Sequence, residues 1–329
     1  MSHPVDINPM FQKDVAMSYT VKLGLDRKSV VLAVFLVLPS LTPPHTLAQV
    51  AGQKTFSSSK QAVDVFIQAV RDGDTSELLA ILGPGMEEVI SSGDSVADKA
   101  GRDRFLAYYN LKHSLASSAS HQVSLNVGKD SWPFPIPLVE SNGKWYWDGA
   151  EGKEEILYRR IGNNELAAIE TCEGAVAAQH DYAATGHDGH SAGMYAQRLV
   201  SEPGKQNGLY WPVREGEAPS PAGPLLARAS SEGYGGSGKP SPYHGYYYRL
   251  LKGQGTNAKG GAKSYVVDRN MIGGFALVAY PADYQSSGVM TFLVNESGAI
   301  YQKDLGDRTA DLAQRMTEYN PDNTWQLVK

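Results

Sequence analysis

Three histidines near the middle of the chain carry side chains that can ligate a metal ion. His180, His187 and His190 lie close together, with Asp181 and Asp188 beside them. Imidazole and carboxylate groups bind zinc, copper or nickel, so this cluster is a candidate metal site. Its irregular spacing and glycine-rich setting are more typical of a solvated loop. The sequence therefore predicts no metal and no other cofactor, and the three histidines are the residues that a metal would use.

Aromatic side chains are a second group with binding chemistry, because their broad apolar faces pack against sugar rings and other ligands. Trp145 and Trp147 alternate along a predicted strand and therefore share one of its faces. Tyr210 and Trp211 lie in a predicted loop. We treat these four as candidate ligand-binding residues. The alternative is that they fill a hydrophobic core or cover a sheet.

Arg159 and Arg160 complete the candidate binding residues. A guanidinium group binds carboxylates and phosphates through paired hydrogen bonds, so two adjacent arginines indicate an anionic ligand. Both arginines lie in a predicted helix. The alternative is a solvated helix face with one arginine pointing inward.

We identify no catalytic residues in the sequence. There is no His-Glu-x-x-His zinc motif and no pair of cysteines, and we expect no Gly-x-Ser-x-Gly nucleophile elbow. Gly233–Lys239 approaches the phosphate-binding loop pattern, but Pro240 stands where a serine or threonine would hold magnesium. The lone Cys172 falls on the apolar stripe of a predicted helix, which is typical of a packed core residue. The sequence favours a protein without an active site over an enzyme and leaves that question open.

The first block of predicted elements runs from helices to strands. Helical spacing covers 57–82 and 103–116, and a strand-like alternation of apolar and polar residues follows at 123–127. A hairpin is predicted across Asn142-Gly143, because this dipeptide favours tight turns. These elements define a first α+β unit, residues 55–150.

The second block repeats that order. A helical stretch, 153–183, is predicted to break at Gly162, and strands with one short helix follow in 246–328. Helices followed by strands, twice, favour antiparallel sheets over β-α-β winding, so we predict an α+β fold. The second unit, 151–329, is a long helix plus an antiparallel sheet.

A short apolar run, Val30–Leu38, follows a basic stretch and precedes the small residue Ala48. This order is that of a secretory signal, and the run is shorter than the roughly 20 residues that span a bilayer. We predict that 1–48 comprises an N-terminal extension and a cleaved Sec-type signal, with translation starting at Met1 or Met17. The protein is then periplasmic or secreted, with no membrane span after signal removal. A retained membrane anchor and a buried strand or helix are the alternatives.

Composition narrows the expected partners. The formal net charge is −5 and no basic patch recurs, so we predict that the chain binds no nucleic acid. The single cysteine, Cys172, cannot form an internal disulfide, and Ala48–Gly52 lacks the cysteine that carries the lipid of a lipoprotein. The partner that we expect is an unknown small molecule, a glycan or an envelope protein.

Six segments of the chain have the residue order of a known family. They are Phe66–Asp74, Trp132–Pro137, Trp145–Asp148, Arg160–Glu165, Gly208–Pro212 and Gly273–Pro281. In these segments the chain resembles an exported bacterial family, domain of unknown function 2950. The resemblance covers about residues 56–328. It implies export in Gram-negative bacteria, and it implies no activity and no functional residues.

Two further resemblances concern shape alone. Residues 57–148 resemble the cone of the nuclear transport factor 2-like (NTF2-like) superfamily, in which helices precede a curved antiparallel sheet. Residues 164–306 resemble the globular part of type IV pilin-like proteins, a long helix followed by an antiparallel sheet. Both resemblances imply a fold, and a fold does not determine a function.

The leading hypothesis is a soluble periplasmic protein that acts as a non-catalytic binding or envelope assembly module. Its candidate surfaces are the mouth of the first sheet near Trp145 and the loops around Tyr210. One alternative is a cell-envelope glycan hydrolase, which needs two carboxyl groups about 5–10 Å apart in a groove. Another is a metal-handling protein. An open polar cavity under the first sheet favours ligand binding, and a filled core there favours a partner role at the surface.

Overall fold

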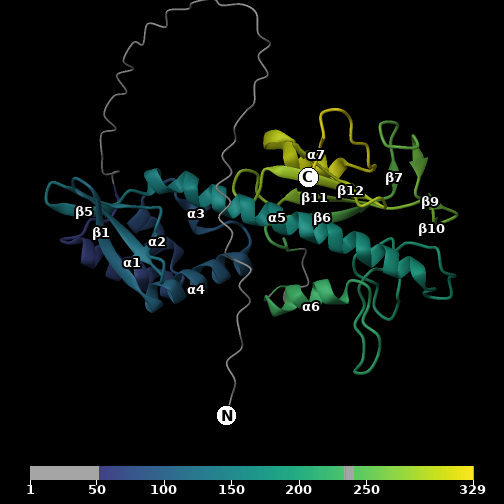
Figure 1. The fold of residues 1–329 in the computed structure, drawn as a ribbon, viewed down its shortest axis with the longest axis horizontal. Helices are drawn as coiled ribbons and strands as arrows, with labels where there is room; N and C mark the ends of the chain where they lie inside the picture. Colours follow the sequence, from purple (N-terminus) through teal and green to yellow (C-terminus); the bar gives the residue numbers. More distant parts are fainter. Residues whose placement is uncertain (1–51, 233, 235–240, 329) are drawn as a thin grey trace, which may run out of the picture. The chain divides into compact units, whose positions relative to one another are not determined.

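The structure, a computed structural model, describes residues 52–232, 234 and 241–328. The predicted signal, 1–48, and nearly all of Gly233–Lys239 lie outside these residues. The described chain consists of helices and antiparallel sheets (Figure 1), which confirms the predicted α+β class. The resemblances to the NTF2-like cone and to pilins stay predictions, and so do the unit boundaries at 55, 150 and 329.

Four helices precede the first sheet. All neighbouring strands of this five-stranded sheet are antiparallel, in the order β1-β2-β4-β5, with β3 beside β2. The elements are α1 (Ser59–Asp72), α2 (Thr75–Leu82), α3 (Glu87–Ile90), α4 (Ser95–Leu111), β1 (His113–Ala119), β2 (Gln122–Val127), β3 (Trp132–Pro133), β4 (Leu138–Ser141) and β5 (Lys144–Trp147).

Short polar side chains begin the main helices of this half. Ser58, Asp74 and Asp94 accept backbone N–H groups at the starts of α1, α2 and α4, which satisfies donors that a helix leaves unpaired. The predicted hairpin is confirmed between β4 and β5. Asn142 and Gly143 there have φ values of 51° and 73°, the left-handed backbone that such a tight turn requires.

The predicted helix over 103–116 is wrong at its C-terminal end. α4 ends at Leu111, and β1 begins at His113. The whole of β1 pairs with β2, with Leu115 opposite Leu125. Helical spacing in a short stretch is a weak preference, and the hydrogen bonds of a strand pair outweigh it.

Aromatic rings fill the interior between the helices and the first sheet. The centroid of the Phe66 ring from α1 lies 4.8 Å from the Trp147 ring and 5.5 Å from the Phe134 ring. Leu125 and Leu138 of the sheet are fully buried in the same cluster. This half of the molecule therefore has a packed core beneath its sheet, the alternative that speaks against ligand binding there.

One long helix, α5 (Gly149–Ala184, 36 residues), follows the first sheet without interruption. The predicted break at Gly162 is therefore wrong. Glycine costs a helix about 1 kcal/mol relative to alanine, and contacts on both sides of it offset that cost here. Arg160 donates to the carbonyl oxygen of Val89, and Asn164 donates to that of Ser287. No helix in the described part of the chain is both long and apolar enough to cross a membrane.

The second half contains another five-stranded antiparallel sheet, in the order β14-β13-β12-β11-β6. Two short hairpins, β7 with β8 and β9 with β10, lie beyond β6 in the sequence. The elements are α6 (Gly223–Ser231), β6 (Tyr246–Leu251), β7 (Gly253–Gln254), β8 (Lys263–Ser264), β9 (Val266–Val267), β10 (Asn270–Met271), β11 (Ala276–Pro281), β12 (Met290–Asn295), β13 (Ile300–Asp304), η1 (Gly306–Arg308), α7 (Thr309–Arg315) and β14 (Gln326–Leu327).

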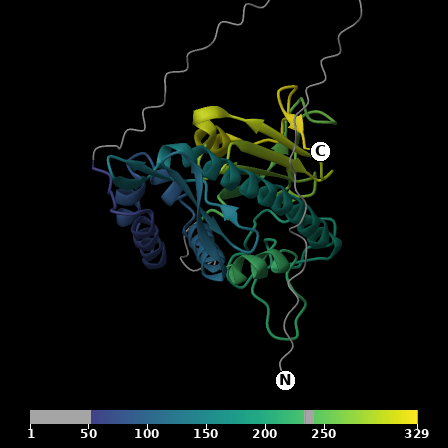
Figure 2. The ribbon, with the colours of Figure 1, turned by 60° about the vertical axis from the view of Figure 1, so that its left-hand side comes forward.

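Helices cover both faces of this second sheet (Figures 1 and 2). Leu277 of β11 is buried in a cluster with Cys172 of α5, and Val278 is buried in a cluster with Ala313 of α7. Successive residues of a strand point to opposite faces, so the interior strand β11 is buried on both. The small residues of α5 allow it to lie close to the sheet.

Candidate functional site

The two predicted tryptophans of β5 belong to the first core. Trp147 is fully buried, and its indole Nε1 donates to the carbonyl oxygen of Ala62 over 3.3 Å. Trp145 is half-buried against the same core, and its backbone pairs with that of Phe56. Trp147 therefore offers no surface to a ligand, and the mouth of the first sheet is closed by packing.

The two adjacent arginines have different surroundings. Arg160 is largely buried, which lowers its pKa from its ordinary value, and it donates to the carbonyl oxygens of Glu88 and Val89. Arg159 stays at the surface, where it pairs with Glu155 over 2.6 Å and lies 4.5 Å above the Trp132 ring. The pair therefore does not grip one anion, and Arg160 ties α5 to the end of α3.

A hollow of about 300 Å³ lies on α1 and α2 and contains several carboxylates. Structural contacts occupy them: Asp64 pairs with Lys60, Glu77 pairs with Lys54, and Asp74 caps α2. Hydrogen bonds from Ser76 and from the backbone N–H of Glu77 hold the pKa of Asp74 below its ordinary value. A group that holds no proton at neutral pH is a poor general acid, and no candidate aromatic residue lies there.

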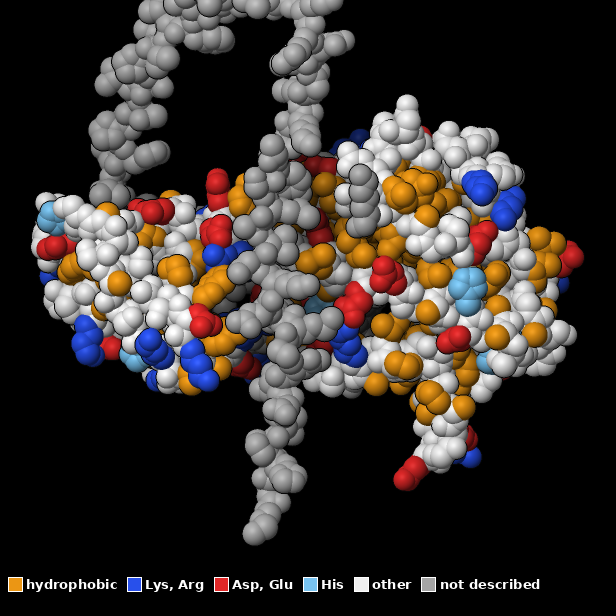
Figure 3. Space-filling view, viewed as in Figure 1, with side chains coloured by type: hydrophobic (Ala, Val, Ile, Leu, Met, Phe, Trp, Pro, Cys, Tyr) orange, Lys and Arg blue, Asp and Glu red, His pale blue; other side chains and the backbone are white. Residues whose placement is uncertain are grey.

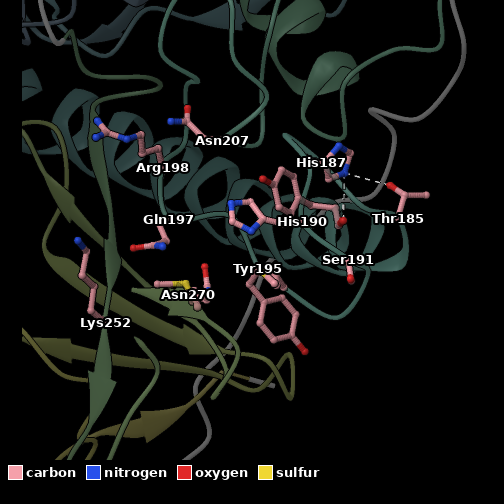
Figure 4. Close-up of a pocket in the computed structure, with 13 residues that line it drawn as sticks. Thr185, His187, His190, Ser191, Tyr195, Gln197, Arg198, Asn207, Lys252 and Asn270 are labelled. Atoms are coloured by element: carbon pink, nitrogen blue, oxygen red, sulfur yellow. Dashed lines mark hydrogen bonds between the residues drawn. The ribbon is translucent and has the colours of Figure 1, made fainter. Parts of the chain in front are cut away.

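The strongest candidate site is a pocket of about 370 Å³ at the C-terminal end of α5 (Figure 4). We call it the α5-end pocket. It is formed by the end of α5, the loop that follows, the residue after β6, and β10. Its lining residues are Tyr182, Thr185, His187, His190, Ser191, Met194, Tyr195, Gln197, Arg198, Asn207, Lys252, Asn270 and Met271.

One wall of the pocket is an aromatic stack. The His187 ring packs on Tyr182 with centroids 4.2 Å apart and lies 5.2 Å from the Trp211 ring. His187 Nε2 is 3.1 Å from the carbonyl oxygen of Tyr182 and 3.0 Å from Thr185 Oγ1, and its Nδ1 is 3.3 Å from Gln206 Oε1. Both ring nitrogens of His187 therefore have protein partners.

Backbone pairing holds the floor of the pocket. The N–H of Tyr195 donates to the carbonyl oxygen of Met271 in β10 over 2.8 Å. Next to it, the buried Gln179 side chain and the backbone of Ala196 exchange two hydrogen bonds of 2.9 Å. Gln197 Nε2 donates to the carbonyl oxygen of Arg269 over 2.6 Å. The strap 195–197 is thereby fixed to both α5 and β10, so the pocket has a defined shape.

Basic groups are in excess around the pocket. Its lining includes Arg198 and Lys252 and contains no aspartate or glutamate. Nearby, Glu202 pairs with both Arg198 and Lys205, over 2.8 Å and 2.5 Å. Hydrogen bonds lower the pKa of Glu202, and the bond from Lys205 contributes more than the bond from Asn207. On the face in Figure 3, by contrast, acidic, basic and apolar side chains are interspersed.

The structure brings together some predicted residues that are distant in sequence. His187 and His190 line the pocket, Trp211 lies behind His187, and Tyr210 pairs through its backbone with Val200 in the same loop. His180 is not part of the lining, and its ring packs against Phe275 with centroids 5.6 Å apart. Among the described residues no three His, Cys, Asp or Glu side chains form a group that could hold a metal ion.

Several pocket residues were not among our candidates, notably Arg198, Lys252 and Asn270. No pattern in the sequence links Lys252 to the loop after α5. Gly189–Gly193 reads Gly-His-Ser-Ala-Gly and matches the Gly-x-Ser-x-Gly nucleophile pattern, so our interpretation that the sequence contains no such pattern was wrong. The segment is an irregular loop and not the strand-to-helix turn that exposes such a serine, and no hydrogen bond joins Ser191 to an imidazole among the described residues.

Comparisons with known proteins place the chain by family alone. A family model described as "Protein of unknown function (DUF2950)" matches residues 53–328, which is most of the chain. No curated protein and no solved structure matches it.

Proposed function

Because the chain belongs to the DUF2950 family, whose description assigns no activity, we propose a function from the geometry of its own residues. The protein is an exported, non-catalytic binding protein that holds a polar small molecule in the α5-end pocket. The apolar run and Ala48 of the predicted signal support export to the periplasm.

The observation that carries this proposal is the pocket itself. Its volume of about 370 Å³ is within the range of small-molecule sites, which are clefts with a few convergent polar groups. Fixed backbone contacts at Tyr195 and Ala196 hold its floor in place before any ligand arrives. Beneath the first sheet, by contrast, the described aromatic side chains Phe66, Phe134 and Trp147 pack against one another.

The chemistry of the lining favours binding over hydrolysis. A glycan hydrolase of the usual kind places two carboxyl groups on either side of the bond that it cleaves. The α5-end pocket, which lies beside the candidate aromatic residue Trp211, is lined by no carboxylate. Nor is Ser191 paired with a base among the described residues. The pocket can therefore hold a polar molecule, and among the described residues its histidine and serine side chains are not joined as a nucleophile and its base.

Native mass spectrometry of the mature chain, purified from the periplasm, tests the proposal. We expect a small-molecule adduct that is released on denaturation. Ser191→Trp places a large side chain at an exposed position in the lining and should abolish the adduct. Ser118→Trp, at an exposed position of β1, is the matched control and should retain it. A chain without any adduct, or equal occupancy in both variants, would contradict the proposal.

A further inference from the structure

We propose that the ligand of the α5-end pocket is an anionic molecule that also carries hydroxyl groups, the chemistry of a sugar acid or a sugar phosphate. This inference rests on the proposed function, because it names the ligand class of the same pocket. Three features of the lining support it: unbalanced positive charge, polar side chains without protein partners, and flat apolar faces beside them.

The first feature is the charge. Arg198 and Lys205 both pair with the carboxylate of Glu202, so these three side chains together carry a net charge of +1. Lys252 makes no ion pair with any described residue, and it lies in the same pocket as Arg198. The chain as a whole carries a formal charge of −5, so the positive charge of the pocket is opposite in sign to the net charge of the chain. A cationic, partly enclosed pocket concentrates anions and repels cations.

The second feature is the set of uncommitted polar groups. Gln197 and Asn207 are already hydrogen-bonded to Arg269 and Glu202. The side chains of His190, Ser191 and Asn270 line the pocket and make no hydrogen bond to another described residue. A hydroxyl and an amide each donate and accept, which is what sugar hydroxyl groups require of a binding site. Figure 4 shows His190 and Ser191, from the loop after α5, and Asn270, from β10, among the residues that line the pocket.

The third feature is aromatic. Tyr195 and Tyr182 line the pocket, and the Tyr195 ring is held edge-on against Phe275 with centroids 4.8 Å apart. The hydroxyl of Tyr182 donates to the carbonyl oxygen of Gln206 over 2.7 Å, so the ring is held by its polar end. Tyr182 is 7% exposed and stacks on His187, so the ring that presents an apolar face to the C–H groups of a sugar is that of the half-buried Tyr195.

Carboxylate and phosphate share the chemistry that Arg198 and Lys252 recognise, so the probes must separate them. Isothermal titration of the mature chain with D-glucuronate, glucose 6-phosphate and D-glucose does so. We expect at least one anion to bind and the neutral sugar to bind at least about tenfold more weakly. Tighter binding of glucuronate identifies a sugar acid as the ligand, and tighter binding of glucose 6-phosphate identifies a sugar phosphate. Added sodium chloride should weaken either complex.

Substitution of one lysine locates the binding. Lys252→Gln removes the unpaired charge and keeps the length of a polar side chain, so the affinity for the anion should fall about tenfold. Lys144→Gln, at an exposed position of β5 with no ion pair among the described residues, is the matched control and should leave the affinity unchanged. The melting temperatures of both variants without ligand show whether the fold is intact.

Failure of this inference is distinguishable from failure of the proposed function. Equal affinity for glucose and both anions, binding of no probe at all, or an unchanged affinity in Lys252→Gln would overturn the anionic ligand. The periplasmic adduct that is lost in Ser191→Trp would still stand in each of these cases. If that adduct is absent as well, the pocket is not a binding site and both proposals fall.

Discussion

Aromatic residues fill the cores of both halves of the molecule, and the halves differ in that aromatic residues of the second half also line a pocket. In the first half, Phe66, Phe134 and Trp147 point inward and fill the space beneath the sheet. In the second half, the sheet is also sealed, but Tyr182 and His187 lie at the end of α5 and leave a pocket beside them. Trp147 lies on a strand, whose alternation turns it toward the core, whereas His187 lies in the loop after α5 and is free to line a surface. The candidate site follows the loop and not the strand.

The largest expected effect concerns the reactivity of Cys172, which is buried between α5 and the second sheet. Burial raises the pKa of the Cys172 thiol to about 12. Because the thiolate is the nucleophile, only about one thiol in ten thousand is reactive at pH 8. An aromatic disulfide reagent should therefore leave Cys172 unmodified in the native chain and modify it rapidly in denaturant.

The direction of the pH dependence is a further check on Cys172. The folded state favours the protonated thiol, so reactivity of the native chain should rise only as the pH approaches 12. Rapid modification at pH 8 without unfolding would show that the sheet and α5 do not seal this face. Solvent would then reach the second half at Cys172 as well as at the α5-end pocket.

The next effect concerns the filled core of the first half. Trp147→Ala removes a fully buried side chain, and we expect it to lower the free energy of unfolding by about 3–5 kcal/mol. Trp132→Ala is the control, because Trp132 is 55% exposed and its loss should cost under about 1 kcal/mol. Urea denaturation measures both values. Similar losses for the two variants would remove the contrast between core and surface aromatics.

A smaller effect separates the two adjacent arginines. Arg160→Met leaves the carbonyl oxygens of Glu88 and Val89 without their donor, which should cost about 2 kcal/mol of stability. Arg159→Met breaks an exposed pair with Glu155 and should cost under about 1 kcal/mol. If the two variants are equally stable, Arg160 is not the tie between α3 and α5 that its contacts indicate.

The smallest effect tests the continuity of α5. Gly162→Ala should stabilise the chain by up to about 1 kcal/mol, because the new Cβ meets no atom within 4 Å and alanine favours a helix. Gly152→Ala is the opposing control. Its Cβ would lie 2.5 Å from Ile136 Cγ1 and 2.7 Å from the carbonyl oxygen of Pro135, so it should destabilise by about 1–3 kcal/mol. A loss of stability in Gly162→Ala would restore the predicted break at that position.

Much of the fold could be predicted because its signals are local. The predicted helix 153–183 lies within α5 (Gly149–Ala184), and the hairpin at Asn142-Gly143 forms where its dipeptide requires it. The errors have a common cause. At Gly162 and in 113–116 the local preference is weak, and contacts with distant segments outweigh it.

The candidate site was less predictable, because its residues come from separate parts of the chain. His187 was a candidate metal ligand and Trp211 a candidate ligand-binding residue, and in the structure the two rings are neighbours. Lys252 and Asn270 reach the same pocket from the end of β6 and from β10. No spacing rule connects these positions, since a pocket in a loop region is defined by distances in space.

The amino-acid order determined the class of fold, the family and the positions of most helices and strands, because periodicity, capping residues and turn dipeptides act over a few neighbouring residues. Tertiary structure alone decided that Trp147 is buried, that Arg160 is hydrogen-bonded to α3, and that basic residues line the α5-end pocket. Burial and electrostatic balance depend on every segment that packs nearby, and those segments meet only after the chain has folded.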